Sequence, residues 1–258
     1  MELIFSILLL GLISGSLANT FIYRIPLSLY PNKTTSSNFK LLGSRSRCTS
    51  CEEIIPIYHN IPVVSYLYLK GKCRFCERSI SLMYPIVEIS AACILLLIYL
   101  KVGITIFFFF FAIFFIFLLV SSAIDIRHGI LPNSINYILI IMGVIGSYFF
   151  DIINIYDSLI GGISGYLVIL VIEKTYALIY KKEGIGRGDA KLLSAIGFWF
   201  GWINLPTILL ISSFTALLVV FILKFMTRNL DRNILESKIP FGPFLSLSTL
   251  FVFLNSHY

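Results

Sequence analysis

Two aspartates stand at the ends of long apolar segments that otherwise carry almost no charge. Asp125 lies in Ser-Ser-Ala-Ile-Asp-Ile-Arg-His-Gly-Ile-Leu-Pro-Asn, and Asp189 lies in Gly-Ile-Gly-Arg-Gly-Asp-Ala-Lys-Leu-Leu. A carboxylate at a bilayer boundary is costly to desolvate, so it is usually paired, hydrated or functional. If the two side chains face each other, they can share one proton and activate water for hydrolysis. The structural alternative is that Asp125 caps its segment beside Arg127 and that Asp189 pairs with Lys191 or Arg187.

Four of the five cysteines form two Cys-x-x-Cys pairs, Cys48 with Cys51 and Cys73 with Cys76, separated by 21 residues. Four thiolates in two such pairs are typical of a tetrahedral zinc site, which has no open position and is therefore structural. Redox pairs and free thiols are the alternatives. Disulfides are disfavoured if this segment lies in the reducing cytoplasm.

The elements that carry these residues are predicted to be membrane helices. The chain is 58% hydrophobic and 13% charged, with a mean hydropathy of +0.92, which excludes a soluble domain with a polar surface. A helix needs roughly 17 to 25 apolar residues to cross a bilayer. We expect an all-α integral membrane protein with about eight spans, near residues 4–22, 84–100, 104–124, 135–150, 159–176, 192–205, 207–225 and 241–254. The sixth is short and carries Gly197, Trp199, Gly201 and Trp202, which suggests that it is tilted or shielded by its neighbours.

The basic residues predict the orientation of these spans. With eight spans, every Lys and Arg except Lys101 falls on one side of the membrane, and such residues are retained in the cytoplasm. The N-terminus is therefore expected outside, while the long loop after the first span, Asp125 and Asp189 are expected at the cytoplasmic face. This topology and anionic lipid headgroups explain the net charge of +7, so we expect membrane lipid as a partner and no nucleic acid.

Several motifs occur together in a characteristic order. Residues 11–26 read Gly-Leu-Ile-Ser-Gly-Ser-Leu-Ala-Asn-Thr-Phe-Ile-Tyr-Arg-Ile-Pro; the cysteine loop follows, then the two aspartate motifs, then Ile-Pro-Phe-Gly-Pro-Phe at 239–244. A Gly-x-Gly-Asp tetrad alone is weak, because glycines are common in membrane helices. The ordered combination resembles the type 4 prepilin peptidases, membrane aspartic proteases that also N-methylate their products.

The resemblance implies an activity, a location and a set of site residues. It implies cleavage of the leader peptide from type IV prepilin or pseudopilin precursors at the cytoplasmic boundary of the bacterial inner membrane, in type IV pilus or type II secretion systems. Asp125 and Asp189 would be catalytic. N-methylation of the new N-terminus would follow, with S-adenosylmethionine as donor, although the loop shows no glycine-rich nucleotide motif that assigns ligands.

The implied organisation has three parts. Residues 1–22 form the first transmembrane helix, residues 23–83 form a cytoplasmic zinc-ribbon-like loop with the four-cysteine metal site, and residues 84–258 form a polytopic membrane aspartic peptidase domain. Glu88, inside the second span, is expected to pair with a buried base or to face a polar cavity. Pro240 and Pro243 around Gly242 predict a broken helix entry or a re-entrant corner near the active site.

Two other functions are compatible with parts of this pattern. A peptidase-only Gly-x-Gly-Asp membrane aspartic protease, such as a preflagellin-peptidase-like enzyme, would share the aspartates but usually lacks the cysteine loop. A non-enzymatic membrane scaffold or transporter with a zinc-binding loop would tolerate Asp125→Asn and Asp189→Asn. A transporter would more often show polar residues in matched halves, and the sequence has no such internal repeat.

Overall fold

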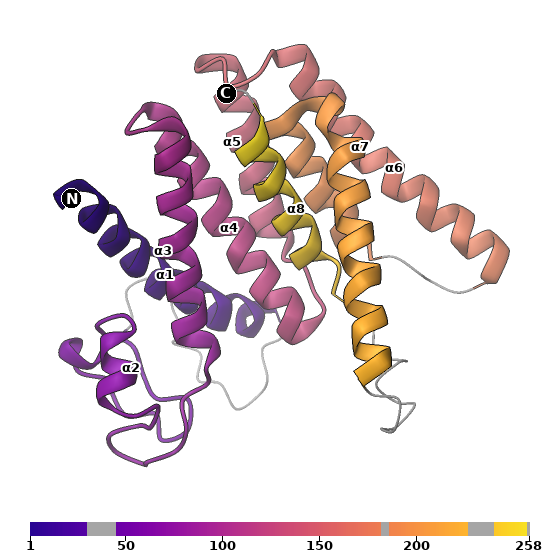
Figure 1. Cartoon of the computed structure of the whole chain (residues 1–258). Coiled ribbons are helices and arrows are strands. Elements are labelled where there is room, and N and C mark those ends of the chain that lie inside the picture. Colours follow the sequence, from indigo (N-terminus) through magenta and orange to yellow (C-terminus); the bar gives the residue numbers. More distant parts are fainter. Residues whose placement is uncertain (30–44, 182–185, 227–239, 257–258) are drawn as a thin grey trace. The chain divides into compact units, whose positions relative to one another are not determined.

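The computed structural model describes residues 1–29, 45–181, 186–226 and 240–256, which are mainly helical, as predicted (Figure 1). In these ranges the β-structure is limited to two isolated bridges, Arg47 with Ile54 and Lys72 with Ser79. The chain divides into two compact units, Met1–Val120 and Ser121–Tyr258. The helices are α1 (Glu2–Leu29), η1 (Ile57–His59), α2 (Val64–Tyr68), α3 (Met83–Val102), α4 (Ile106–His128), α5 (Asn133–Phe149), α6 (Ile155–Tyr180), α7 (Arg187–Met226) and α8 (Gly242–Asn255).

The helices account for about eight membrane-spanning segments. Among the described residues, α1, α3, α4, α6 and α7 are long and apolar enough to cross a membrane, and α5 and α8 are shorter apolar helices. A straight helix with the 40 residues of α7 would be about 60 Å long, twice the hydrocarbon thickness. Gly201 interrupts it with non-helical backbone angles, φ 72° and ψ 170°. The predicted sixth and seventh spans are therefore the two arms of α7, and Figure 1 shows the chain turning back between them.

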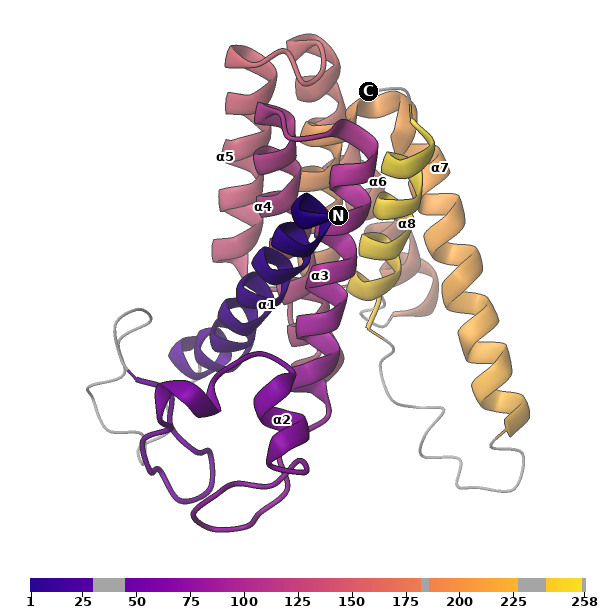
Figure 2. The ribbon, with the colours of Figure 1, turned by 60° about the vertical axis from the view of Figure 1, so that its left-hand side comes forward.

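In the first unit, α1 and α3 pack side by side through small residues (Figure 2). A Cβ atom at Gly15 would lie 2.6 Å from the Cα atom of Glu88, and Gly11 meets the backbone of Ala92 equally closely. The amide of Asn19 donates to the backbone carbonyl of Tyr84 at 3.0 Å. Because Gly11 and Gly15 have no side chain, the backbones of α1 and α3 come into direct contact, which is a common way for membrane helices to associate.

In the second unit, the first arm of α7 is held by α5 and α6. Gly161 and Gly197 bring the backbones of α6 and α7 into contact, and Ser194 Oγ donates to the carbonyl of Gly162 at 2.8 Å. Trp199 Nε1 donates to the carbonyl of Leu139 on α5 at 2.8 Å. Hydrogen bonds and close small-residue contacts are the interactions that join membrane helices, so they fix the arm that begins beside Asp189.

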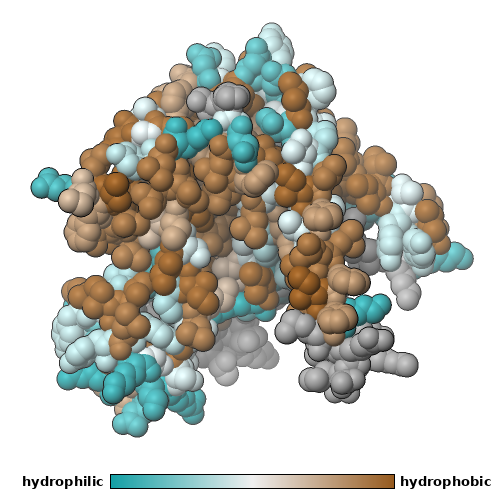
Figure 3. All heavy atoms as spheres, viewed as in Figure 1, coloured by the Kyte–Doolittle hydropathy of each residue, from teal (hydrophilic) through white to brown (hydrophobic). Residues whose placement is uncertain are grey.

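The surface has the pattern of a membrane protein. In Figure 3 apolar residues cover the long helices, and hydrophilic residues gather at their ends and on the loop between α1 and α3. Large apolar side chains on these helices are exposed, for example Ile163 of α6 at 58% and Phe214 of α7 at 64%. Water would penalise such a surface, whereas lipid tails solvate it. The chain is a multi-pass membrane protein.

Candidate active site and candidate metal centre

Asp125 lies in the last turn of α4, where the helix ends in a glycine cap. Gly129 has φ +63°, and its N–H donates to the carbonyl of Asp125 at 2.8 Å. The Asp125 side chain is 6% exposed, and its Oδ2 atom accepts a hydrogen bond from the backbone N–H of Gly242 at 2.9 Å. A buried carboxylate is thus held by a donor that is 117 residues away in sequence.

Gly242 is the first residue of α8, and the residue type is dictated by the contact. A Cβ atom at this position would lie 2.8 Å from Asp125 Oδ2 and 3.1 Å from Leu131 Cδ2. Proline follows at the start of the helix, where its missing N–H costs nothing. The first N–H groups of a helix have no intrahelical acceptor, and the helix dipole favours an anion there. The helix entry predicted around Gly242 thus supplies a donor to Asp125.

Asp189 lies in the first turn of α7 and hydrogen-bonds the residue that precedes the helix. Its backbone N–H donates to the carbonyl of Gly186 at 3.0 Å, and its carboxylate accepts a hydrogen bond from the backbone of Gly186. The carboxylate at the third helical position thus accepts the N–H of the N-cap residue, as the acid of a capping box does, while the glycine contributes its backbone carbonyl in place of a side chain. Both aspartates therefore accept a backbone N–H from the N-terminal end of a helix, although Asp125 itself belongs to the end of α4.

The two carboxyl groups lie near each other, within one unit of the chain. The charge of Asp125 acts on Asp189. Leu131 connects their surroundings, because a Cβ atom at Gly188 would lie 2.9 Å from Leu131 Cβ while Gly242 approaches the other end of the same side chain. The structure therefore brings together the two aspartates that the sequence singled out.

The alternative partners proposed for Asp189 are engaged elsewhere. Lys191 Nζ donates to Asn133 Oδ1 at 2.7 Å and lies 5.6 Å from the centre of the Tyr137 ring. Arg187 Nε lies 3.7 Å from Glu173 Oε1. Asp189 is thus not neutralised by the two bases that flank it in the sequence, which favours a chemical role for it over a structural ion pair.

Two serine side chains form a chain of hydrogen bonds that ends at the backbone carbonyl of Gly242. This chain was not predicted from the sequence. Ser122 Oγ donates to Ser246 Oγ at 2.7 Å, and Ser246 Oγ donates to the carbonyl of Gly242 at 2.9 Å. Ser122 lies three residues before Asp125, and Ser246 lies four residues after Gly242. That spacing places each serine on the same helix face as its neighbour, which was the available signal.

Two further polar side chains of the second unit are buried without a hydrogen-bond partner among the described residues. Ser121 Oγ and both amide atoms of Asn136 have no hydrogen-bond partner among the described residues, and their residues are fully buried. Ser121 lies one helical turn before Asp125, on its face of α4. Buried polar groups of this kind are usually satisfied by ordered water. Ser121, which neighbours Asp125 on α4, is therefore a position where an ordered water molecule can lie.

Four of the five cysteines, Cys48, Cys51, Cys73 and Cys76, form one cluster built from two similar turns. The N–H groups of Cys48 and Cys73 donate to the carbonyls of Glu53 at 3.0 Å and Arg78 at 2.9 Å, respectively. Glu52 and Glu77, each four residues after the first cysteine of its pair, both have positive φ angles. The repeated backbone path directs all four thiols to one point.

The geometry of the thiols suits a tetrahedral metal ion. Their Sγ atoms lie within 4.8 Å of one another, and those of Cys48 and Cys76 are 3.9 Å apart. Four sulfurs at about 2.3 Å from zinc lie roughly 3.8 Å apart, so the cluster needs little adjustment. All five cysteines are described and free of disulfides.

The thiols of the first pair differ in acidity. Burial opposes ionisation of Cys48, but hydrogen bonds from the backbone of Cys51 and Ser50 and from neighbouring thiols outweigh it and lower its pKa to about 7. At Cys51 a backbone hydrogen bond from Glu53 favours the thiolate, yet burial and the adjacent thiols prevail and raise its pKa to about 12. Adjacent sulfurs resist simultaneous ionisation unless a cation joins them.

Glu88 connects the cysteine loop to α3. The side chain is 8% exposed, and Oε2 accepts a hydrogen bond from the backbone N–H of Val63 at 2.7 Å. Val63 has φ +60°, a strained conformation for a β-branched residue. Asn19 of α1 also hydrogen-bonds Glu88. The expected partner was a buried base or a polar cavity; the partners found are a backbone N–H and an amide.

Comparison with known proteins gives consistent results for both parts of the chain. Residues 9–102 match the bacterial peptidase A24 N-terminal domain, and residues 112–221 match the type IV leader peptidase family. A protein of Pseudomonas putida named prepilin leader peptidase/N-methyltransferase is 33% identical over 252 residues, covering 93% of this chain and 86% of its own length. A protein of the same name from Pectobacterium carotovorum is 31% identical and covers 94% of this chain and 89% of its own length. Another, from Pseudomonas aeruginosa, is 33% identical and covers 93% of this chain and 86% of its own length. No solved structure matches the chain.

Proposed function

Because this chain belongs to the type IV leader peptidase family, it is a membrane aspartic peptidase with an N-methyltransferase activity, and we propose that Asp125 and Asp189 hydrolyse the leader bond of a prepilin or pseudopilin. The observation that carries this assignment is the pairing of two carboxyl groups, each hydrogen-bonded by a backbone N–H at a helix N-terminus. A peptidase needs one group that removes a proton from water and one that protonates the carbonyl oxygen. Two neighbouring carboxyl groups that share a proton can supply both.

The reaction follows from this arrangement. The ionised member of the pair accepts a proton from a water molecule, and the resulting hydroxide attacks the carbonyl carbon of the scissile peptide. The protonated member donates its proton to the carbonyl oxygen, which gives a neutral tetrahedral intermediate. Collapse of this intermediate breaks the C–N bond: the carboxyl group that took the proton from water donates it to the leaving amine, and the other carboxylate takes a proton from a hydroxyl of the intermediate, which restores the pair. Because the charge of one carboxyl group acts on the other, the pair titrates as a unit.

The Gly242 hydrogen bond orients Asp125 for this task. It occupies Oδ2, and no other hydrogen bond to the Asp125 side chain is found among the described residues. Oδ1 is therefore the atom that we assign to the water or the shared proton. A fixed carboxylate costs less reorganisation when the transition state forms, which is the source of most electrostatic catalysis.

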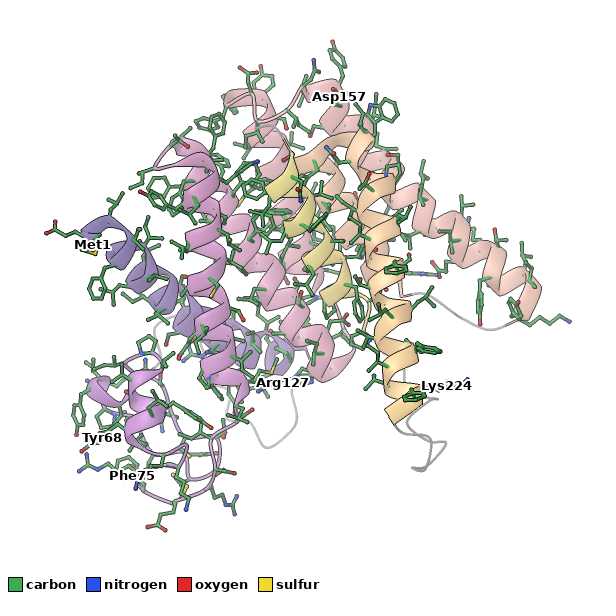
Figure 4. All side chains as sticks on the ribbon, in the orientation of Figure 1. Met1, Tyr68, Phe75, Arg127, Asp157 and Lys224 are labelled. Atoms are coloured by element: carbon green, nitrogen blue, oxygen red, sulfur yellow. The ribbon has the colours of Figure 1, made fainter. Side chains whose placement is uncertain are left out.

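We place the active site at the cytoplasmic face. In Figure 4, Arg127 and Lys224 lie toward one end of the second unit, and Asp157 lies at the other. Basic residues are retained in the cytoplasm, so the end with Arg127, two residues after Asp125, is assigned to that side. A leader peptide that reaches the boundary is extended there and accessible to hydrolysis, whereas a helix within lipid has its backbone groups satisfied.

We assign zinc to the four cysteines of the loop. The sulfur donor set and the separations between the sulfurs support this choice, since thiolates select zinc and four protein ligands complete its coordination. Zinc at this site would stabilise the loop and leave hydrolysis to the aspartates. We retain the division into a first helix at 1–22, a metal-binding loop at 23–83 and a peptidase domain at 84–258 as a proposal; α1 itself continues to Leu29.

S-adenosylmethionine is the proposed methyl donor for the amine that hydrolysis releases. The names of the similar proteins support this second step. The donor would supply an activated methyl group, and the amine must be unprotonated to accept it. The order of events follows, because the methylated nitrogen exists as a free amine only after the leader has been removed.

Mass spectrometry of a purified prepilin tests the proposal. The full-length protein in detergent should remove the leader from the precursor, and addition of S-adenosylmethionine should add one methyl group to the mature N-terminus. Cleavage without methylation would retain the peptidase and reject the second activity. A properly presented precursor that is never cleaved would support the scaffold alternative instead.

A further inference from the structure

We propose that the loop between α1 and α3 makes a membrane contact of its own, through an apolar face that docks on the anionic lipid surface beside the spans. The face consists of Ile57, Ile61, Val64 and Leu67, and we call it the loop face. It belongs to the short helices η1 and α2 and the turn that joins them. None of these side chains takes part in the active site or in the cysteine cluster.

The loop face is exposed to a degree that needs an explanation. Ile57 is 84% exposed, Ile61 49%, Val64 59% and Leu67 70%. Val64 and Leu67 are three residues apart on α2 and therefore share one side of that helix. Four large aliphatic groups exposed to water favour association with another apolar surface, and such patches usually mark a binding surface.

The position of the loop relative to α3 indicates lipid as the occupant. Val63, the residue before Val64 of the loop face, donates its backbone N–H to Glu88 Oε2 at 2.7 Å. Glu88 is the sixth residue of α3 and lies about 8 Å along the helix from Met83. Its neighbours Ile86 and Ile89 are 58% and 49% exposed, as expected for side chains that face lipid. The loop face is thus held at a level where α3 has already entered the apolar layer.

Figure 3 shows the same polarity across the loop: apolar residues lie toward the spans, and hydrophilic residues gather at the opposite end. Phe75, which stands between Cys73 and Cys76, lies toward the end of the loop away from α1 in Figure 4. A surface graded in this way, apolar on one side and polar on the other, is typical of elements that lie in the plane of a membrane interface.

The charge and the aromatic residues of the loop fit anionic headgroups. Residues 45–82 contain six Lys or Arg residues and three Glu residues, so the loop is positive. Tyr58 and Tyr68 are 60% and 78% exposed, and Arg74 Nη1 donates to the Tyr58 hydroxyl at 3.3 Å. Tyrosine is enriched at membrane interfaces, and basic residues near them are attracted to anionic lipid. These features favour a lipid surface over the apolar helix of a protein, which needs no positive charge.

The test is depth-dependent quenching of fluorescence in the full-length protein, reconstituted in nanodiscs. Val64→Trp places a probe in the loop face, and Phe75→Trp places a matched probe in the same loop outside the face. The native Trp199 and Trp202 contribute to both and are subtracted with the unsubstituted chain. Lipids brominated on the upper acyl chain should reduce the added emission of Val64→Trp roughly twofold, because an interfacial element lies at the depth of these bromine atoms. The added emission of Phe75→Trp should change little.

Retention of the bound metal shows that the loop of a variant is folded. If Val64→Trp does not retain it, Leu67→Trp is used as the face probe instead. Replacing phosphatidylglycerol with phosphatidylcholine should weaken the quenching of either face probe. The proposal is overturned if both face probes are quenched no more than Phe75→Trp. It is also overturned if shielding of the face probes appears only after a prepilin is added, since the face would then bind the protein substrate.

Discussion

The backbone N–H of Gly242 donates to Oδ2 of Asp125 at 2.9 Å, so the first residue of the last helix orients one carboxylate of the dyad. The donor is an N-terminal helix amide, which has no acceptor in its own helix. The acceptor is buried at 6% exposure and would otherwise lose its hydrogen bonds to water. The contact therefore satisfies both groups and ties α8 to α4.

Gly242→Ala should lower kcat for prepilin cleavage by roughly 10- to 100-fold, because a methyl group 2.8 Å from Asp125 Oδ2 must displace the carboxylate. Steady-state kinetics on a purified prepilin measure the change. Gly186→Ala is the matched control: its Cβ atom would lie 3.4 Å from Asp189 Oδ2, an ordinary contact, and the N–H is retained. Equal losses in the two variants would argue against a specific role for the Gly242 contact.

Ser246→Ala should reduce kcat by about threefold to tenfold, the cost of one hydrogen bond that holds the Gly242 carbonyl. Ser248→Ala provides the comparison, since Ser248 is also a buried serine on α8 but bonds only within its own helix. The Michaelis constant should stay constant in both. If Ser248→Ala impairs the enzyme as strongly, the effect comes from α8 stability and not from the chain of hydroxyls that reaches Ser122.

Cys73→Ser should reduce the bound zinc from about one ion per chain to a small fraction of that value, because three thiolates bind zinc more weakly than four. Elemental analysis of the purified protein gives the result. Binding should also weaken at acid pH, since the thiols must lose protons to coordinate the ion. Cys93→Ser, outside the cluster, should leave the zinc content unchanged. Absence of zinc from the unsubstituted chain would discard the metal assignment.

Gly197→Ala should destabilise the second unit by about 1–3 kcal/mol, because the added methyl group would overlap the Gly161 backbone in the α6–α7 contact. The unfolding midpoint in detergent reports this change. Ile163→Ala on the exposed side of α6 serves for comparison and should have a smaller effect. A larger shift for Ile163→Ala would mean that the close glycine contact is not what holds the two helices together.

The residues that carry strong local signals were predictable from the sequence. Asp125 and Asp189 stand out because charge is rare in apolar segments, and the cysteine pairs stand out by their spacing. The count of about eight spans followed from apolar length, although the sixth and seventh are arms of one helix broken at Gly201. The start of α8 was also predictable, because prolines and glycine mark a helix entry.

Contacts between distant segments could not be predicted in this way. The bonds from Gly242 to Asp125 and from Ser122 to Ser246 depend on how α4 and α8 are placed, and serine in a membrane helix usually bonds its own backbone. Val63 gave no signal either, because its φ of +60° contradicts the preference of a β-branched residue. Tertiary interactions override local preference at these positions.

The most direct test of the aspartate pair compares prepilin cleavage by the unsubstituted protein with that by Asp125→Asn and Asp189→Asn, each purified in detergent and shown to be folded. Asparagine keeps the size of the side chain but can neither accept the proton from water nor share it. Each variant should lose cleavage by at least roughly 1000-fold, since both carboxyl groups act in the same step. Substantial cleavage by either variant would contradict the mechanism.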